Sequence, residues 1–112
     1  MSLRSYEIAQ NTTENPRNTE YRLFAQVTKS LMDVDSSERN ALAKAIHWNR
    51  RLWMTLQADC ADEANVLSDQ TRAGIISLAI WVDKYSRDVL RGEAEVAPLI
   101  EVNRSIMEGL AA

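Results

Sequence analysis

Hydrophobic residues recur along the chain at helical spacing, in stretches separated by short polar breaks. Apolar residues three and four positions apart fall on one face of an α-helix. The stripe of the first long stretch consists of Phe24, Val27, Leu31 and Val34. Stripes of this kind predict four main helices, over about 16–34, 37–59, 69–91 and 95–110. A further short helix is expected over about 3–10, with Tyr6 as its apolar anchor.

The expected helix ends have sequence signals of their own. Asn15 is typical of an N-cap because proline, which favours the first helical position, follows it. Ser36 or Ser37 is expected to cap the second long helix, and Ser68 the third. Gly92 is the expected C-terminal stop of the third helix, since glycine adopts the left-handed conformation that ends many helices. The segment 60–67 is then a loop.

The composition favours an all-helical chain. The 112 residues include only three Gly and two Pro, well below average usage. An all-β sandwich would need many more turn residues, whereas 46% hydrophobic and 26% charged residues are typical of a globular protein. We therefore expect one all-α domain over residues 1–112, a small bundle of about four main helices plus a short N-terminal helix.

Charge and cysteine content exclude several function classes. The net charge of -3 disfavours broad nucleic-acid affinity, which needs a basic field. One cysteine, Cys60, allows no intramolecular disulfide and fits a reducing cytosol. Together with the single His47 it is too little for a metal cage of the usual ligands. No apolar run approaches the roughly 20 residues of a membrane-spanning helix. We expect a cytoplasmic protein without metal, cofactor or membrane insertion.

The sequence lacks the motifs that most often mark an enzyme. It contains no glycine-rich phosphate loop, no zinc-protease motif and no nucleophile elbow. Cys60 could meet His47 only through tertiary folding, and a lone cysteine is usually a small buried hydrophobe. Asp59, Asp62 and Glu63 could hold a hard cation, but a solvated loop is the simpler interpretation because such sites need many converging oxygens. No enzymatic activity is expected.

A basic stripe lies on the second predicted helix. Lys44, His47 and Arg51 share one helix face, and Arg50 flanks it. The stripe could contact an acidic partner or phosphates. The same pattern is typical of the solvated side of an amphipathic helix, and we favour this simpler interpretation.

Two asparagines, Asn49 and Asn103, interrupt apolar stripes. Burying an unpaired amide costs on the order of 1–3 kcal/mol, so each needs a hydrogen-bond partner. One interpretation is a hydrogen bond that fixes the register inside the bundle. The other is capture of a partner's backbone in a groove. The structural interpretation is favoured because buried polar groups are generally satisfied within the protein.

The segment 73–82, AGIISLAIWV, has only Ser77 as a polar residue. A surface helix normally shows a single apolar stripe. The segment is therefore either the central helix of the bundle or has a second face for a partner, and Gly74 is expected to allow close helix approach.

Trp48 and Trp53 point about 140° apart on their helix. Partly exposed tryptophans beside an apolar helix are typical of a protein-binding groove, so partner binding and plain core packing remain alternatives.

Four segments, in order, resemble the flagellar biosynthesis regulator family called FlaF. They are NPRNTEYRLFAQVTKSL at 15–31, HWNRRLWMTLQADCADEAN at 47–65, LSDQTRAGIISLAIWVDKYSRDVLRG at 67–92 and VNRSIMEGL at 102–110. The resemblance implies a small, cytoplasmic, helical and non-catalytic protein that promotes flagellin production and secretion. It further implies flagellin as the partner, bound by a secretion chaperone or adaptor. Our hypothesis for the mechanism is that an apolar groove of the protein binds the amphipathic helical terminal segments of flagellin.

The resemblance also leaves a second function class open. In it, the protein regulates flagellin translation after transcription, through the opposing regulator FlbT or through flagellin mRNA. No binding residue is carried over from the family, so the partner-binding residues are predicted on physical grounds. They are Trp48, Asn49, Arg50, Arg51, Trp53, Arg72, Ile76, Trp81 and Asn103. In this prediction the tryptophans and the helix of 73–82 wall a groove, the asparagines hold polar groups of the partner and the arginines set its orientation.

Overall fold

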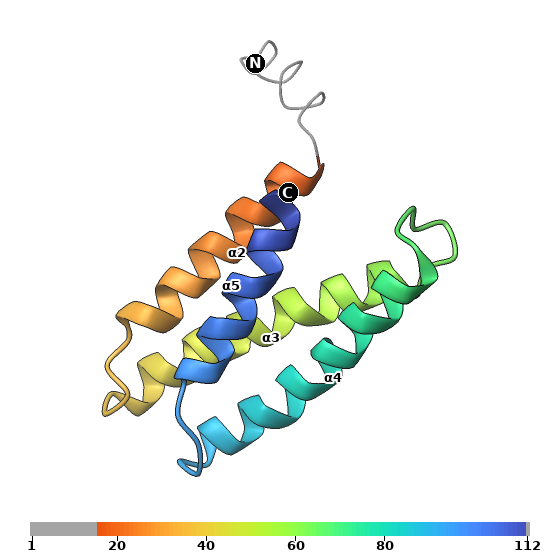
Figure 1. Ribbon diagram of the computed structural model, residues 1–112. Helices are drawn as coiled ribbons and strands as arrows, with labels where there is room; N and C mark the ends of the chain where they lie inside the picture. Colours follow the sequence, from red (N-terminus) through yellow and green to blue (C-terminus); the bar gives the residue numbers. More distant parts are fainter. Residues whose placement is uncertain (1–15, 112) are drawn as a thin grey trace.

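The computed structural model describes residues 16–111, which fold into four α-helices (Figure 1). They are α2 (Pro16–Asp33), α3 (Arg39–Ala61), α4 (Asp69–Leu90) and α5 (Ala97–Ala111). The described residues contain no strand, which confirms the predicted all-α class. The predicted helix over 3–10 and the predicted cap Asn15 lie outside the described residues.

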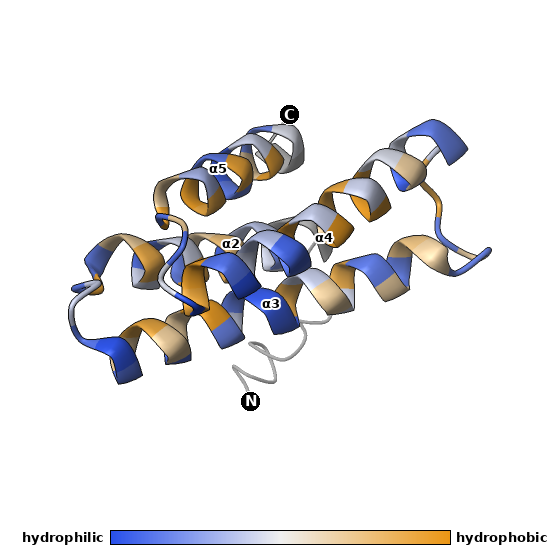
Figure 2. Ribbon diagram, turned by 90° about the horizontal axis from the view of Figure 1, so that it is seen from below, coloured by the Kyte–Doolittle hydropathy of each residue, from blue (hydrophilic) through white to orange (hydrophobic). Residues whose placement is uncertain are grey.

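The helices form two antiparallel pairs that cross. α3 and α4 make a long hairpin, and α2 lies beside α5 near the two ends of the described chain (Figure 1). α2 also packs on α3, whereas α4 and α5 approach each other at few positions. The half of α4 that follows the 62–68 loop therefore runs away from α5, and Figure 2 shows hydrophobic stretches along it there. Among residues 16–111, no helix is both long and apolar enough to pass through a membrane.

The start of α3 differs from the prediction. Neither Ser36 nor Ser37 caps it: the helix begins after Glu38, which makes no capping hydrogen bond through its side chain. Asp35 explains the shift, because its carboxylate accepts hydrogen bonds from the backbone N–H and the hydroxyl of Ser37, at 2.9 and 2.7 Å. These bonds hold a local turn, and they lower the pKa of the Asp35 carboxyl, the backbone N–H bond most.

The expected signals at both ends of α4 are confirmed. Ser68 caps the helix, its hydroxyl oxygen accepting the Thr71 N–H at 3.2 Å. Gly92 adopts a φ of 78° just past the other end. The Gly92 N–H donates to the Val89 carbonyl at 3.0 Å, and the next N–H along the chain donates to the Asp88 carbonyl at 2.9 Å. This pattern is a Schellman motif, which satisfies carbonyls that the helix leaves unpaired.

The hydrophobic core combines all four helices. Its largest fully buried side chains are Trp53, Phe24, Leu42, Ile46 and Leu99. The rings of Phe24 and Trp53 meet edge to face, with centroids 5.5 Å apart and planes at 83°, a favourable geometry for an aromatic pair. The predicted stripe of the first helix is thus the core face of α2, since Phe24, Val27 and Leu31 are buried.

A buried hydrogen-bond network lies inside this core. The Trp53 indole N–H donates to the Asn103 side-chain oxygen at 2.8 Å. The Asn103 amide NH₂ donates to the Asn49 side-chain oxygen at 2.8 Å and to the Thr28 hydroxyl at 3.1 Å. All four residues are buried. Since they come from α2, α3 and α5, the network joins three helices through side chains. We refer to these four residues as the Asn103 network.

We expect Asn103→Leu to lower the free energy of unfolding by about 3 kcal/mol. Leucine fills the space of asparagine, so the loss comes from the buried polar groups of Trp53, Asn49 and Thr28 that are left without a partner. Urea denaturation followed by circular dichroism measures it. Ser105→Ala, on the exposed side of α5, is the control and should change stability by less than about 0.5 kcal/mol. A leucine variant as stable as the wild type would contradict the structural role of the network.

Two glycines provide a second test, and one corrects a prediction. Gly74 was expected to allow close helix approach, but nothing lies within 4 Å of the position its Cβ would occupy. The prediction is wrong because α4 faces open space there. Gly74→Ala should therefore stabilise the protein by about 0.5–1 kcal/mol through helix propensity. Gly92→Ala should destabilise it by about 1 kcal/mol, since its positive φ is strained for alanine. Equal effects of the two substitutions in thermal unfolding would contradict this account.

Candidate functional site

The three tryptophans occupy three different environments. Trp53 is buried in the core and its N–H is bonded to Asn103. Trp48 is half-buried on α3. Trp81 is 37% exposed on α4 and stacks on Tyr85, with ring centroids 4.8 Å apart and planes at 16°. Of the three, Trp81 offers the largest ordered aromatic surface to a partner.

The two asparagines predicted as candidate partner contacts lie inside the protein. Asn49 and Asn103 are fully buried, and their side chains are bonded to each other. The Asn49 NH₂ group has no hydrogen-bond partner among residues 16–111, and the same is true of the buried Ser86 hydroxyl. This geometry matches the register-fixing interpretation of the asparagines. In this conformation Asn49, Trp53 and Asn103 present no surface to a partner.

The three predicted arginines have separate surroundings. Arg50 donates two hydrogen bonds to the Asp83 carboxylate of α4, at 2.7 and 3.2 Å. Arg51 is exposed and forms no ion pair with any described residue. Arg72 donates to the backbone carbonyls of Cys60 at 2.7 Å and Asp62 at 3.1 Å, which ties the start of α4 to the end of α3. Arg72 therefore holds the 62–68 loop.

An apolar surface runs along one side of α4. Leu78 is 36% exposed, and Trp81 and the half-buried Tyr85 follow it at the spacing of successive helical turns. We call Leu78, Trp81 and Tyr85 the α4 aromatic surface. Ile76, which was predicted as a site residue, is half-buried on another side of the same helix. The sequence prediction missed Leu78 and Tyr85, although the spacing 78, 81 and 85 was the signal that could have identified them.

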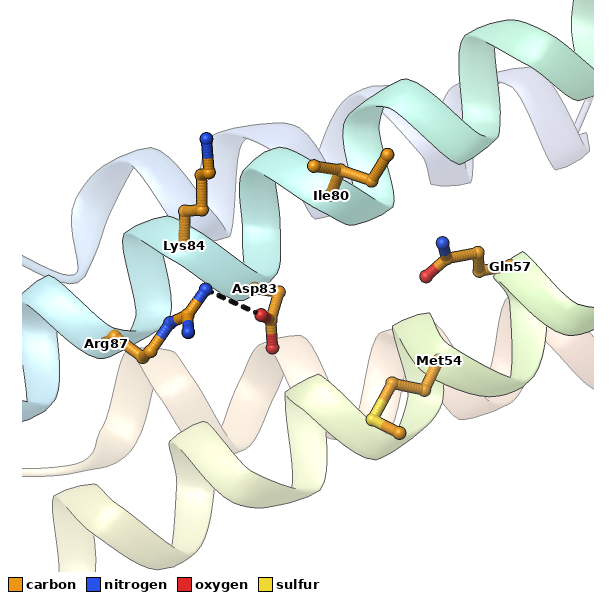
Figure 3. Close-up of a pocket in the computed structure, with 6 residues that line it drawn as sticks. All are labelled: Met54, Gln57, Ile80, Asp83, Lys84 and Arg87. Carbon is orange, nitrogen blue, oxygen red and sulfur yellow. Dashed lines mark ion pairs between the residues drawn. The ribbon is translucent and has the colours of Figure 1, made fainter.

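A second apolar spot lies on the opposite side of the α3–α4 hairpin. Met54 of α3 and Ile80 of α4 are 58% and 49% exposed. They line a shallow depression of about 320 Å³. Its other lining residues are Gln57, Asp83, Lys84 and Arg87 (Figure 3). Both apolar residues were missed from the sequence, because a helix stripe does not show which of its flanks a neighbouring helix leaves uncovered.

Cys60 corrects the predicted start of the loop. It was placed at the beginning of the segment 60–67, but α3 continues to Ala61 and the thiol is buried. Burial raises the pKa of the Cys60 thiol, and the nearby carboxylates of Asp59 and Glu20 raise it further. The thiol is therefore protonated at neutral pH and poorly nucleophilic. Among the described residues, no cluster of three His, Cys, Asp or Glu side chains is arranged to hold a metal ion.

The fold and the site describe a small all-α protein whose helices leave apolar and basic side chains exposed at defined surfaces. Over residues 2–110, nearly the whole chain, the sequence matches the family model of flagellar protein FlaF. The chain belongs to the FlaF family, which confirms the resemblance of its four segments. No curated protein and no solved structure matches it. Membership supports a role connected with the flagellum, in a family that is not known as an enzyme family.

We expect Arg72→Met to loosen the 62–68 loop. Methionine keeps an apolar stem but removes both donors to the Cys60 and Asp62 carbonyls, and charge-assisted hydrogen bonds of this kind contribute about 2 kcal/mol. Amide hydrogen exchange in the loop should speed up accordingly. Arg51→Met removes the same group from an arginine without an ion pair in the described chain and should leave exchange unchanged. Equal exchange in both variants would contradict the role of Arg72.

Proposed function

We propose that this protein promotes flagellin synthesis or secretion by binding flagellin as a secretion chaperone or adaptor, without catalysing a reaction. Family membership supports the flagellar context. The observation that carries the proposal is the α4 aromatic surface, on a helix that packs mainly on α3. Large apolar side chains exposed in register on one helix are a feature of protein-binding surfaces.

The α4 aromatic surface suits an amphipathic helix as its ligand. Leu78, Trp81 and Tyr85 follow each other by one helical turn, so their side chains form a continuous row. An apolar helix face can lie along such a row with contacts at every turn. The stack of Trp81 on Tyr85 already orders both rings, which reduces the side-chain entropy lost on binding. The helical terminal segments of flagellin are ligands of this kind.

The proposed contact differs from the groove expected from the sequence. That groove used Trp53 as a wall and Asn49 and Asn103 as polar contacts, whereas these three residues are taken up by the Asn103 network. We therefore place the contact on the α4 aromatic surface, with Trp81 as the central anchor. The half-buried Trp48 lies on α3 and is not required for it.

Titration of flagellin monomer into the full-length protein by calorimetry tests the proposal. Trp81→Ala should weaken binding about tenfold or more, because a truncated aromatic anchor typically costs more than about 1 kcal/mol. Leu78→Ser should weaken it as well. Neither side chain is buried, so both variants should keep the wild-type circular dichroism spectrum. Met54→Ala, on the opposite side of the hairpin, is the matched control and should bind as tightly as the wild type.

Two outcomes would contradict this function. One is wild-type affinity of the folded Trp81→Ala and Leu78→Ser variants for flagellin, which would exclude the α4 aromatic surface as the binding site. The other is no binding of soluble, monomeric flagellin to the wild-type protein. The regulator of flagellin translation that acts through FlbT or flagellin mRNA would then be the better account.

A further inference from the structure

Met54 and Ile80 mark a surface that the proposed flagellin contact does not use. Ile80 and Leu78 are two residues apart on α4, so their side chains point about 160° apart. The depression between Met54 and Ile80 is open to solvent along the seam of α3 and α4 (Figure 3). Two large, exposed apolar side chains at the rim of a depression form a place where an apolar side chain of another molecule can be buried.

Positive charge surrounds this depression. The Asp83 carboxylate is shared by two guanidinium groups, those of Arg50 at 2.7 Å and Arg87 at 3.0 Å. One carboxylate compensates only one of the two cations, so this ion-pair group retains a net positive charge. Lys84 also lines the depression and has no ion-pair partner among the described residues.

The neighbouring face of α3 adds further cations. Arg51 precedes Met54 by three residues and Lys44 precedes it by ten, so they lie about 60° and 80° around α3 from Met54, on the flank away from α4. Neither forms an ion pair within the described part of the chain. With Lys84 and the ion-pair group, the surface carries four uncompensated positive charges, on a protein whose net charge is -3. Positive charge is therefore concentrated here against the overall sign. We call this surface, with Met54 and Ile80 at its centre, the basic face.

We propose that the basic face binds an acidic amphipathic helix of a second protein partner. An apolar side chain of that helix occupies the depression between Met54 and Ile80, and its carboxylates pair with Lys44, Arg51 and Lys84. The seam between two antiparallel helices is a shape into which a third helix packs. The complementary charges steer the encounter and set the orientation of the bound helix.

Two polyanionic ligands fit the basic face less well. The centre of the face is apolar, and a phosphate backbone has no apolar side chain to place between Met54 and Ile80. An anionic membrane would require apolar side chains that protrude and insert between lipids, whereas Met54 and Ile80 line a hollow.

Fluorescence anisotropy with synthetic peptides and the full-length protein tests the proposal. The probe is a labelled helical peptide of about four turns, with leucines on one face and glutamates elsewhere. A peptide with lysines in place of the glutamates is its matched partner. We expect saturable binding of the acidic peptide, weakening with salt, and at least tenfold weaker binding of the basic one. Lys84→Glu and Arg51→Glu should each weaken binding about fivefold.

Control variants distinguish binding at the basic face from an effect of the overall net charge and from purely ionic binding. Arg104→Glu reverses an exposed charge on α5 and should change the affinity less than twofold. Met54→Ser should weaken peptide binding although it changes no charge. Flagellin binding should be the same in Lys84→Glu as in the wild type, so the outcome is independent of the proposed flagellin contact.

Several results would overturn the proposal. They include no saturable binding of the acidic peptide, equal binding of both peptides, and equal weakening by Arg104→Glu and Lys84→Glu. A single-stranded RNA oligonucleotide and vesicles containing phosphatidylglycerol serve as competing probes. If either binds through Lys84 and Arg51 while the acidic peptide does not, the basic face is a phosphate-binding surface and not a protein-docking one.

Discussion

The hydrogen bond from the Trp53 indole to Asn103 is the interaction on which the arrangement of the helices depends. It places a polar group from α3 and one from α5 in the centre of an apolar core. A buried polar group without a partner is costly. Sliding α5 by one turn would break this bond together with those from Asn103 to Asn49 and Thr28. The network therefore allows one register of α2, α3 and α5, where apolar packing alone tolerates several.

The position of α4 is set by contacts outside this network. None of the hydrogen bonds of the network comes from α4, which is held by apolar packing on α3, by the Arg50–Asp83 ion pair and by Arg72 at the loop. One side of the helix is thus committed to the core through Ala79, Val82 and Val89. Its other sides carry the α4 aromatic surface and part of the basic face. The apolar character of 73–82 on all sides is explained by this division: part of it is core, and part of it is exposed.

Most of the fold could be predicted from the sequence, because helix stripes and end signals are local. Ser68 and Gly92 mark the ends of α4 as expected. The start of α3 was misplaced because Ser37 is hydrogen-bonded to Asp35 and does not cap the helix. Residue preferences do not show which of these two local arrangements forms. The stripes also identified Asn49 and Asn103 as residues that need partners. That Asn103 bonds Trp53, 50 positions away, depends on helix packing and could not be predicted.

The candidate site was less predictable for the same reason. Three tryptophans suggested an exposed aromatic surface, but the sequence could not show that Trp53 fills the core while Trp81 remains accessible. The exposure of a side chain depends on which neighbouring helix covers it. The sequence prediction missed Met54 and Ile80 for this reason, because the depression that they line forms only where α3 packs on α4.

Photo-crosslinking from two nearby positions on α4 tests the central claim most directly. A benzoylphenylalanine replaces either Leu78 or Ile80, both of which are exposed in the free protein and point to nearly opposite sides of one helix. Each variant is irradiated with flagellin monomer, and the crosslinked product is quantified. The proposed α4 contact predicts a flagellin crosslink from position 78 and little from position 80. A crosslink from position 80 alone, or none from position 78 while flagellin binds, would contradict it.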